Sequence, residues 1–299
     1  MKRCLVLRAE RAWLVLAMLC DTKADGEKTN SKLKLVINMK KTLIPSLPMW
    51  LPEEIRAIGH GSDIYDSSCS PEARVYFIDR DGGYYLKVGG AGKLRQEAEM
   101  TAYFYKKGLG TEILSYVSGE KDIMLSRAVA GLDCTSDIYL AEPKRLCDLL
   151  AERLRMLHEL DASDCPVRDR VGEYVAMGEL NYAKGTYNTD HFPDSFGYRS
   201  GEEAYRVLQE GKHLLKNEVL IHGDYCLPNV MLDDWKFSGF IDLGAAGMGD
   251  RHIDLFWGRW TLEFNLHTDK FGERFLDAYG RDKVDEEKLL IVAAAEVLY

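Results

Sequence analysis

Short apolar runs and longer helical patterns divide the chain into a strand-rich first part and a helix-rich second part. The short runs lie at residues 74–78, 84–88, 113–117 and 122–126, and turns of small or polar residues separate them. Runs of this length between turn residues are typical of β-strands. Leucines then recur every three or four residues over residues 143–160, which predicts an amphipathic helix. The sequence therefore predicts an α+β protein.

Helical spacing recurs in several other segments. A first helix is expected to begin near Leu51, because a proline and two acids follow it and such residues favour a first helical turn. Residues 182–200 are rich in Gly, Asn, Asp and Pro, so they are expected to be mostly loop. The further helices are expected at residues 95–104, 171–181, 202–215, 256–266, 271–279 and 286–298.

The composition is that of an ordinary globular protein with an excess of negative charge. Of the 299 residues, 46% are hydrophobic and 29% are charged, and the net charge is −9. Binding to nucleic acid needs a basic surface, so nucleic acid is not an expected partner. An acidic chain suits a cationic small molecule better.

The cysteines do not form a recognisable metal or disulfide pattern. There are seven of them, they are scattered, and no CxxC pair occurs. This predicts reduced thiols rather than a disulfide framework or a zinc site. A nucleophilic Cys226 is an alternative, but no second histidine accompanies it in a suitable pattern.

Residues 1–38 carry the weakest pattern of the chain. Their apolar run at residues 12–20 is shorter than the roughly 20 residues that span a bilayer, so no membrane association is expected. The run vaguely resembles a signal peptide, but charged residues interrupt its approach. We expect residues 1–38 to be a poorly ordered N-terminal extension of a cytoplasmic protein that begins near Met39.

An acid, an amide and a second acid follow one another around a predicted β-hairpin. Asp224 follows a short apolar run, Asn229 comes five residues later, and Asp242 ends a second apolar patch. Phosphoryl transfer needs a carboxylate that orients the attacking hydroxyl, and amide and carboxylate oxygens that bind Mg²⁺. The same order occurs in the HRDxxxxN and DFG motifs of protein kinases. The pattern therefore predicts phosphoryl transfer, and a solvated hairpin with incidental acids is the alternative.

A lysine in an apolar strand indicates where nucleotide phosphates would bind. Lys87 lies between Leu86 and Val88 and is expected to point to the opposite face of the strand. Burying its charge costs free energy unless an acid pairs with it. Glu97 on the next predicted helix is the expected partner, and Glu99 is its rival. Such a pair holds the α- and β-phosphates in kinases.

The stretches HGDYCLPNVM and FSGFIDLG resemble the aminoglycoside 3′-phosphotransferases, antibiotic kinases of the protein-kinase-like fold. The resemblance runs from Leu51 to Tyr299. It implies a two-lobe fold with a small N-lobe at residues 39–128, an antiparallel sheet with one helix that binds the nucleotide. The larger and mostly helical C-lobe at residues 129–299 would carry the catalytic loop and the acceptor site.

The resemblance also implies roles for single residues. Asp224 would be the catalytic base, and Asn229 and Asp242 would hold Mg²⁺. Tyr85 would stack on adenine, although a core aromatic in a strand is nearly as good an interpretation. The residues implied in nucleotide binding are Lys87, Glu97, Ser70 as a phosphate contact, Tyr85, and Ala128 through its backbone.

The implied acceptor is a cationic aminoglycoside, whose binding site must be acidic. The implied acceptor-binding residues are Asp190 in the loop before the catalytic strand, and Glu296 and Tyr299 at the end of the last helix. The chain departs from the family where Val297 replaces a second acid and where Ala245 replaces an arginine. Both departures bear on the acceptor more than on the chemistry.

The resemblance thus implies transfer of the γ-phosphoryl group of ATP or GTP, with Mg²⁺, to a hydroxyl of an aminoglycoside antibiotic. The 3′-hydroxyl is the expected position, and the outcome would be antibiotic resistance. One alternative is a same-fold kinase for a macrolide, choline or a sugar; for choline, an aromatic cage would be expected from Tyr182, Tyr187, Phe192 and Tyr198. Another alternative is a non-catalytic nucleotide-binding module.

Three further polar residues are expected to be structural. His158, at the end of a predicted helix, is interpreted as a core or capping residue, with a general base as the alternative. Asp250 and Asp254 follow the second acid motif and are expected to brace the catalytic loop.

Overall fold

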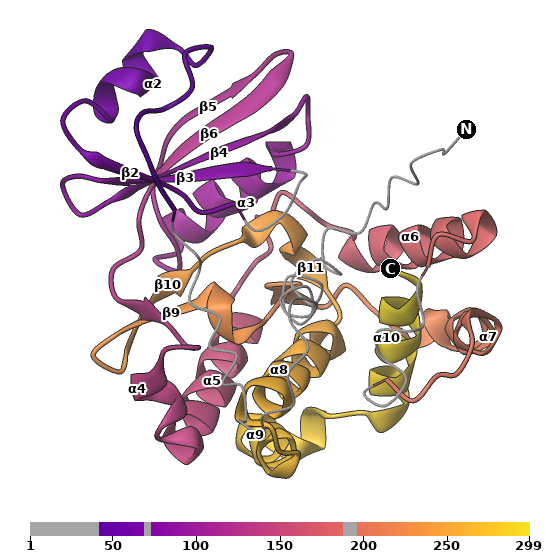
Figure 1. The fold of residues 1–299 in the computed structure, drawn as a ribbon. Helices are drawn as coiled ribbons and strands as arrows, with labels where there is room; N and C mark the ends of the chain where they lie inside the picture. Colours follow the sequence, from indigo (N-terminus) through magenta and orange to yellow (C-terminus); the bar gives the residue numbers. More distant parts are fainter. Residues whose placement is uncertain (1–41, 69–72, 188–195) are drawn as a thin grey trace, which may run out of the picture. The chain divides into compact units, whose positions relative to one another are not determined.

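The structure, a computed structural model, describes residues 42–68, 73–187 and 196–299 (Figure 1). These residues form both strands and helices, so the predicted α+β class is confirmed. The expected extension at residues 1–38 lies outside the described residues.

The described residues group into two compact units. The sheet unit contains residues up to Tyr139 together with Pro228–Gly244, and the helical unit contains Leu140–Leu227 and Ala245–Tyr299. The predicted lobe boundary after residue 128 stays a prediction. The units divide the chain differently, because strands within Pro228–Gly244 pair with a short strand that precedes Tyr139.

The sheet unit is built on a six-stranded antiparallel sheet with the order β1-β2-β3-β4-β6-β5 (Figure 1). All four strands predicted in this part of the chain are present, and two short strands at one end of the sheet were not predicted. The strands are β1 (Thr42–Ile44), β2 (Asp63–Asp66), β3 (Arg74–Asp79), β4 (Tyr84–Gly90), β5 (Ile113–Ser118) and β6 (Lys121–Arg127).

The two faces of this sheet pack against different helices. The first helix, α2 (Glu53–Ile58), contributes Ile55 to a core cluster that contains Leu86 of β4. The second helix, α3 (Arg95–Lys106), contributes Ala98 to a smaller cluster with Met124 of β6. Because Met124 pairs with the residue after Leu86 in the ladder, the two clusters lie on opposite faces.

A β-hairpin completes the sheet unit at the position where the sequence predicts one. Its turn residues Asp234 and Trp235 both have positive φ angles, 46° and 64°, as a two-residue hairpin turn of type I′ requires. The hairpin strands and their partner are β9 (Val230–Asp233), β10 (Lys236–Phe240) and β7 (Leu132–Asp133), and a short helix α4 (Asp137–Leu140) follows β7.

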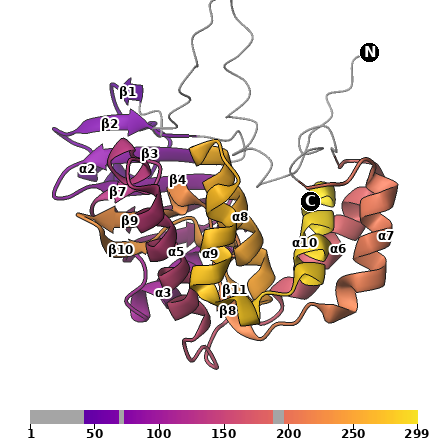
Figure 2. The ribbon, with the colours of Figure 1, turned by 90° about the horizontal axis from the view of Figure 1, so that it is seen from below.

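The helical unit consists of two groups of three helices (Figures 1 and 2). Helices α5, α8 and α9 pack together, α6, α7 and α10 pack together, and α8 also contacts α10. The helices are α5 (Pro143–His158), α6 (Arg170–Lys184), α7 (Gly201–Gly211), α8 (Arg251–Leu266), α9 (Lys270–Gly280) and α10 (Glu286–Leu298). A two-stranded antiparallel sheet joins β8 (Val219–Ile221) to β11 (Gly247–Gly249), and short 3₁₀ turns lie at Lys212–Leu214, Leu227–Asn229, Leu243–Ala245 and Arg281–Lys283.

Every predicted helix is present, and the differences concern the helix ends. Helix α8 begins at Arg251, five residues before the predicted start at residue 256, because the Asp250 side chain accepts a hydrogen bond from the His252 N–H and caps the helix. Helix α6 continues to Lys184, where Gly185 adopts a left-handed conformation and ends it.

The described residues bear on two further expectations. None of their helices is long and apolar enough to cross a membrane. The four cysteines that the structure describes, Cys134, Cys147, Cys165 and Cys226, are buried free thiols, as predicted.

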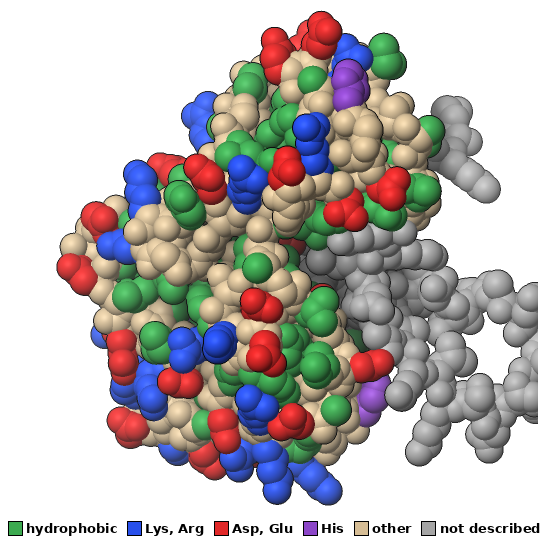
Figure 3. Space-filling model, turned by 90° about the vertical axis from the view of Figure 1, so that its left-hand side faces the viewer, with side chains coloured by type: hydrophobic (Ala, Val, Ile, Leu, Met, Phe, Trp, Pro, Cys, Tyr) green, Lys and Arg blue, Asp and Glu red, His purple; other side chains and the backbone are tan. Residues whose placement is uncertain are grey.

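One face of the surface is shown in Figure 3, where lysine and arginine side chains are interspersed with aspartate and glutamate side chains. Hydrophobic side chains lie between them in small groups. On this face, therefore, the acidic side chains are not gathered into one area.

Leu86 tests the main core of the sheet unit, because its side chain is fully buried. We expect Leu86→Ala to lower the free energy of unfolding by about 2–5 kcal/mol, through lost apolar burial and a residual cavity. Chemical denaturation measures the change. Leu43→Ala, at a position that is 61% exposed, is the matched control and is expected to change the value by less than about 0.5 kcal/mol. Equal effects of the two substitutions would contradict this account of the core.

Candidate active site

Strand β4 presents Lys87 on the face of the sheet that α3 covers. Lys87 pairs with Met124 in the β4–β6 ladder, and Met124 packs against α3. The Lys87 Nζ donates a hydrogen bond to the Oε1 of Glu97 on α3, at 2.6 Å. Glu99 is exposed. The structure thus pairs Lys87 with the predicted partner and not with its rival.

Lys87 also contacts a second carboxylate, that of Asp242. Burial alone would lower the pKa of the Lys87 ammonium, but the charges of Asp242 and Glu97 outweigh burial and hold the pKa well above its usual value. Lys87 therefore remains a cation at physiological pH. A strand lysine held by a helix glutamate is the pair that contacts nucleotide phosphates in kinases.

The two predicted metal ligands, Asn229 and Asp242, lie at the open end of the β9–β10 hairpin. The Ile241 N–H donates to the Asn229 carbonyl at 3.1 Å, so the residue before Asp242 is paired with Asn229 across the base of the hairpin. Asn229 is 2% exposed, whereas the Asp242 side chain is 45% exposed. Asp242 has a φ of 60°, a left-handed conformation that aspartate tolerates better than most residues.

The donor chemistry of this pair fits Mg²⁺. Asn229 offers an amide oxygen and Asp242 a carboxylate, and Mg²⁺ binds one or two such side chains and completes its octahedron with water and nucleotide phosphates. Among the described residues, no three His, Cys, Asp or Glu side chains form a cluster that could hold a metal ion by themselves.

The other predicted nucleotide contacts lie partly on the same surface. Tyr85 is two residues before Lys87 on the same face of β4, and its ring is 5.1 Å from that of Phe77. The Ala128 N–H donates to the Gly83 carbonyl at 2.9 Å, so an adenine contact through this residue would use its carbonyl oxygen. Ser70 lies outside the described residues.

In the helical unit, one buried carboxylate holds the start of the predicted catalytic loop. Asp254 of α8 has no exposed surface, and its two oxygens accept hydrogen bonds from the His222 N–H at 2.7 Å and the Gly223 N–H at 2.6 Å. Gly223 has a φ of 81°, and a side chain at this position would collide with the Ala245 carbonyl. The loop therefore requires both the glycine and the aspartate.

Asp224 is half-buried between fully buried neighbours on either side. Its N–H donates to the His222 Nδ1 at 3.3 Å, and the Cys226 thiol donates to its Oδ1 at 3.3 Å. Further along, the Tyr225 hydroxyl donates to the Leu150 carbonyl at 2.8 Å. The buried neighbours fix the loop, and Asp224 between them remains partly exposed. Cys226 contacts this carboxylate as a hydrogen-bond donor.

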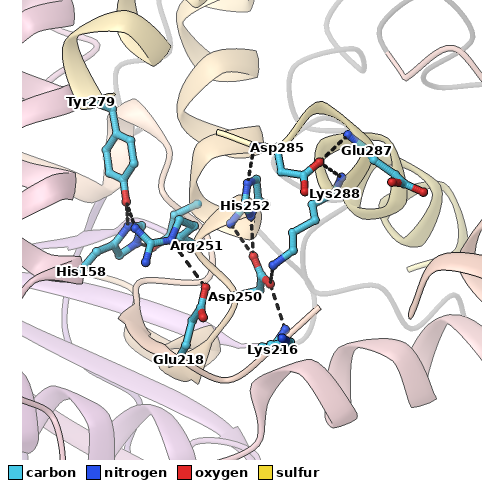
Figure 4. A network of polar contacts seen from close by, with 11 residues as sticks. His158, Lys216, Glu218, Asp250, Arg251, His252, Tyr279, Asp285, Glu287 and Lys288 are labelled. Atoms are coloured by element: carbon cyan, nitrogen blue, oxygen red, sulfur yellow. Dashed lines mark hydrogen bonds and ion pairs between the residues drawn. The ribbon is translucent and has the colours of Figure 1, made fainter. Parts of the chain in front are cut away.

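His158 contacts Asp254 and so belongs to the support of the loop; Figure 4 shows it beside Arg251 and Tyr279. It is buried, its Nε2 lies 3.1 Å from the Asp254 Oδ2, and its Nδ1 lies 2.8 Å from the Tyr279 hydroxyl. Because a carboxylate only accepts, we assign the proton to Nε2, and Nδ1 then accepts from Tyr279. Arg251 in turn donates to the Tyr279 hydroxyl at 3.2 Å. Burial lowers the pKa of His158 even though the Asp254 carboxylate opposes this effect.

Asp250 has a different role from Asp254. It caps α8, accepts from the Lys216 N–H at 2.9 Å, and contacts Lys288 of α10 at 2.9 Å (Figure 4). Burial would raise the pKa of Asp250, but hydrogen bonds from His252 and Lys288 hold it well below its usual value. Asp250 thus connects the start of α8 to α10, whereas Asp254 contacts the catalytic loop directly.

The predicted acceptor residues lie at the end of α10, apart from Asp190, which lies outside the described residues. Glu296 is only 7% exposed, and its Oε1 accepts from the Tyr174 hydroxyl at 2.6 Å and the Trp257 Nε1 at 2.8 Å. The Tyr299 ring lies 5.7 Å from that of Tyr174. The sequence analysis did not identify Tyr174 or Trp257, although an acid in an otherwise apolar helix is a sign that donors must lie nearby.

Removing a charge from Asp254 tests the support of the loop. Asp254→Asn leaves one acceptor oxygen for two backbone N–H groups, so we expect the free energy of unfolding to fall by about 3 kcal/mol. Amide exchange at His222 and Gly223 should become faster. The control is Asp277→Asn, whose side chain is 66% exposed. If amide exchange at the loop is unchanged in Asp254→Asn, this account of its support is wrong.

The lowered pKa of His158 predicts a pH dependence of stability. Below a pH of about 6.5 this histidine takes up a proton in the unfolded chain, whereas in the folded protein its lowered pKa keeps it neutral. The free energy of unfolding is therefore highest above that pH and decreases as the pH falls. We expect His158→Gln to lose less stability than the wild type between pH 7 and pH 5, as measured by thermal unfolding. His213→Gln, at an exposed position, is the control. Parallel profiles of wild type and His158→Gln would contradict the prediction.

Comparisons with known proteins identify the family. The family model described as "Phosphotransferase enzyme family" matches residues 70–290. A protein of Lactococcus lactis subsp. lactis (strain IL1403) named "Probable aminoglycoside 3'-phosphotransferase" is 49% identical over 270 residues, which cover 90% of this chain and 99% of that protein.

Two solved structures share the fold. The aminoglycoside-3′-phosphotransferase of type VIII matches with a TM-score of 0.70 at 25% identity, over 82% of this chain and 97% of its own. The aminoglycoside phosphotransferase APH(3'')-Id of Streptomyces rimosus, in complex with ADP and streptomycin, matches with a TM-score of 0.64 at 24% identity, over 75% of this chain and 90% of its own. The predicted protein-kinase-like fold is confirmed. The chain is a kinase and belongs to the phosphotransferase enzyme family, among the aminoglycoside 3′-phosphotransferases.

Proposed function

We propose that this kinase transfers the γ-phosphoryl group of ATP, with Mg²⁺, to the 3′-hydroxyl of an aminoglycoside antibiotic and thereby confers resistance. The observation that carries the proposal is the contact of Lys87 with both Glu97 and Asp242 beside Asn229. The acceptor follows from the name of the Lactococcus relative, which matches almost over its full length. The same chemistry with GTP remains an alternative, and the cytoplasm, where ATP is available, is the proposed location.

In this mechanism the sheet unit holds the nucleotide. Lys87, fixed by Glu97, contacts the α- and β-phosphates, and Tyr85 packs against the adenine. Asn229 and Asp242 supply oxygen ligands for Mg²⁺. The metal ion, when bound, neutralises charge on the phosphates during transfer. Replacing the Lys87–Asp242 contact by contacts to phosphate and metal would leave the lysine paired with Glu97.

Asp224 acts on the acceptor. Its carboxylate orients the hydroxyl and accepts its proton while the new bond between the acceptor oxygen and the γ-phosphorus forms and the bond to the β–γ bridging oxygen breaks. The Cys226 thiol and the loop contacts to Asp254 hold this carboxylate in one orientation. Positioning and electrostatics supply most of the rate in such a reaction. Glu296, Tyr299 and Asp190 are the proposed contacts to the cationic acceptor.

The choline alternative receives no support from the aromatic residues. Tyr182 stacks on Tyr205 with a centroid distance of 3.9 Å and an angle of 6°, and on Tyr187 at 5.6 Å and 17°. A cage needs rings inclined around one cation, whereas these rings are parallel to one another. The Tyr198 hydroxyl donates to the Leu290 carbonyl at 2.8 Å, and Phe192 lies outside the described residues.

The first test is coupled ADP release by purified protein with ATP and Mg²⁺ on a panel of acceptors. We expect turnover of kanamycin and neomycin and none of 3′-deoxy analogues, a macrolide, choline or simple sugars. Turnover of the 3′-deoxy analogues would overturn the proposed hydroxyl. ATP binding without turnover of any acceptor would favour a non-catalytic nucleotide-binding module instead.

The proposed base is tested by Asp224→Asn, which keeps the shape of the side chain but cannot accept the proton. We expect kcat to fall by about 10²–10⁴-fold, because this is the contribution of a positioned general base. The KM for ATP and the melting temperature should not change. Cys226→Ser, which keeps a donor beside Asp224, is the matched control and is expected to retain activity. A kcat for Asp224→Asn close to that of the wild type would overturn the assignment.

A further inference from the structure

The C-terminal end of α10 is held by a buried amide from another helix. Asn181 of α6 is 6% exposed, and its Nδ2 donates to the Leu298 carbonyl at 3.0 Å and to the Tyr299 carbonyl at 2.9 Å. The last carbonyls of a helix have no partner within the helix. A side chain of α6 therefore caps the end of α10, where two of the proposed acceptor contacts lie.

The same amide also holds the point where the chain leaves α6. The Asn181 Oδ1 lies 3.3 Å from the Thr186 hydroxyl, and the Thr186 N–H donates to the Asn181 carbonyl at 3.0 Å. Thr186 directly follows Gly185, whose φ of 61° ends the helix. Asn181 thus uses both amide protons and its oxygen, and it connects the exit of α6 with the end of α10. A buried amide with all these bonds made fixes one arrangement of the groups it joins.

A second residue of α6, two turns earlier, acts on the same end of α10. The Tyr174 hydroxyl lies 2.6 Å from the Glu296 Oε1 and 3.2 Å from the Val292 carbonyl. Its single proton goes to the carboxylate, because the distance is shorter and the acceptor is charged. The Trp257 N–H of α8 donates to the same oxygen at 2.8 Å. Two donors on one oxygen fix the direction in which the Glu296 carboxylate points.

Other polar contacts attach the first half of α10. The Asp285 N–H donates to the His252 Nε2 at 2.9 Å, and Lys288 contacts Asp250 at 2.9 Å (Figure 4). The Tyr198 hydroxyl donates to the Leu290 carbonyl. These contacts already attach the helix to the unit. The contacts of Tyr174, Asn181 and Trp257 are additional, and they lie within the last two turns of the helix.

We propose that Tyr174, Asn181 and Trp257 are positioning residues for the acceptor, which set the direction of the Glu296 carboxylate and the place of Tyr299. The proposal rests on the proposed function, since it assumes that these two residues contact the acceptor. According to the proposal, the affinity for the acceptor depends on these three side chains even if none of them touches the acceptor. Nucleotide affinity is independent of these side chains, because the proposed nucleotide contacts lie in the sheet unit.

The proposal is tested by Tyr174→Phe and Asn181→Leu, which remove the donors while keeping similar volumes. We expect each variant to raise the KM for kanamycin about 10- to 100-fold, the factor expected when a donor to a charged or buried acceptor is lost. The kcat at saturating kanamycin and the KM for ATP should stay within about twofold of the wild type.

The matched control is Tyr198→Phe, which removes a tyrosine hydroxyl from a carbonyl in the first half of α10. We expect its KM for kanamycin to stay within about twofold of the wild type, whatever its effect on the melting temperature. Tyr174→Phe, the milder substitution, decides the question if Asn181→Leu does not fold. An unchanged KM in Tyr174→Phe, or an equal rise in Tyr198→Phe, would show that these contacts serve stability alone and would overturn the proposal.

The wild type in the same assay separates this inference from the proposed function. If the wild type phosphorylates no aminoglycoside, the proposed function itself fails and the inference fails with it. If the wild type is active and the variants keep its KM for kanamycin, only the inference fails.

Discussion

A carboxylate without contact to water must find its hydrogen-bond donors inside the protein, and the catalytic loop of this kinase depends on one such group. Asp254 accepts from two successive backbone N–H groups, those of His222 and Gly223, and from the imidazole of His158. Three donors offset the cost of burying its charge. Because the donors of the loop are fixed in this way, the next residue, Asp224, is held partly exposed while its neighbours are buried.

In the sheet unit, Lys87 is a cation whose charge is likewise balanced by partners inside the protein. Lys87 lies between Glu97, ten residues later in the sequence, and Asp242, 155 residues later. The strand, the helix and the hairpin that carry these three residues pack through their apolar side chains. This packing brings the charged side chains together. A lysine with two acidic partners keeps its charge, and a nucleotide phosphate can then replace one of the partners.

The end of α10 carries one acid fewer than the resemblance implies, since Val297 stands where a second acid is expected. The one acid in this part of α10, Glu296, is held by neutral donors from two other helices. Neutral donors fix the direction in which this carboxylate points without cancelling its charge. The contacts of Glu296 therefore belong to the proposal on acceptor positioning, together with the number of acids at the end of this helix.

From the sequence alone we predicted the fold class, most of the strands and the helices, and these are confirmed. The sequence also singled out Asp224, Asn229, Asp242, Lys87 and Glu97 as candidate site residues, because such candidates depend on short motifs and local periodicity. It also favoured Glu97 over Glu99, and the pairing in the structure agrees. It did not reveal that Tyr174, Asn181 and Trp257 hold the end of α10, or that Asp254 and His158 form one chain of hydrogen bonds. These side chains are far apart in the sequence, and nothing local distinguishes a tyrosine or an asparagine that packs in a core from one that donates to a distant carboxylate or carbonyl. These contacts become visible in the folded chain alone, because a hydrogen bond requires two groups to lie within about 3 Å of each other in space.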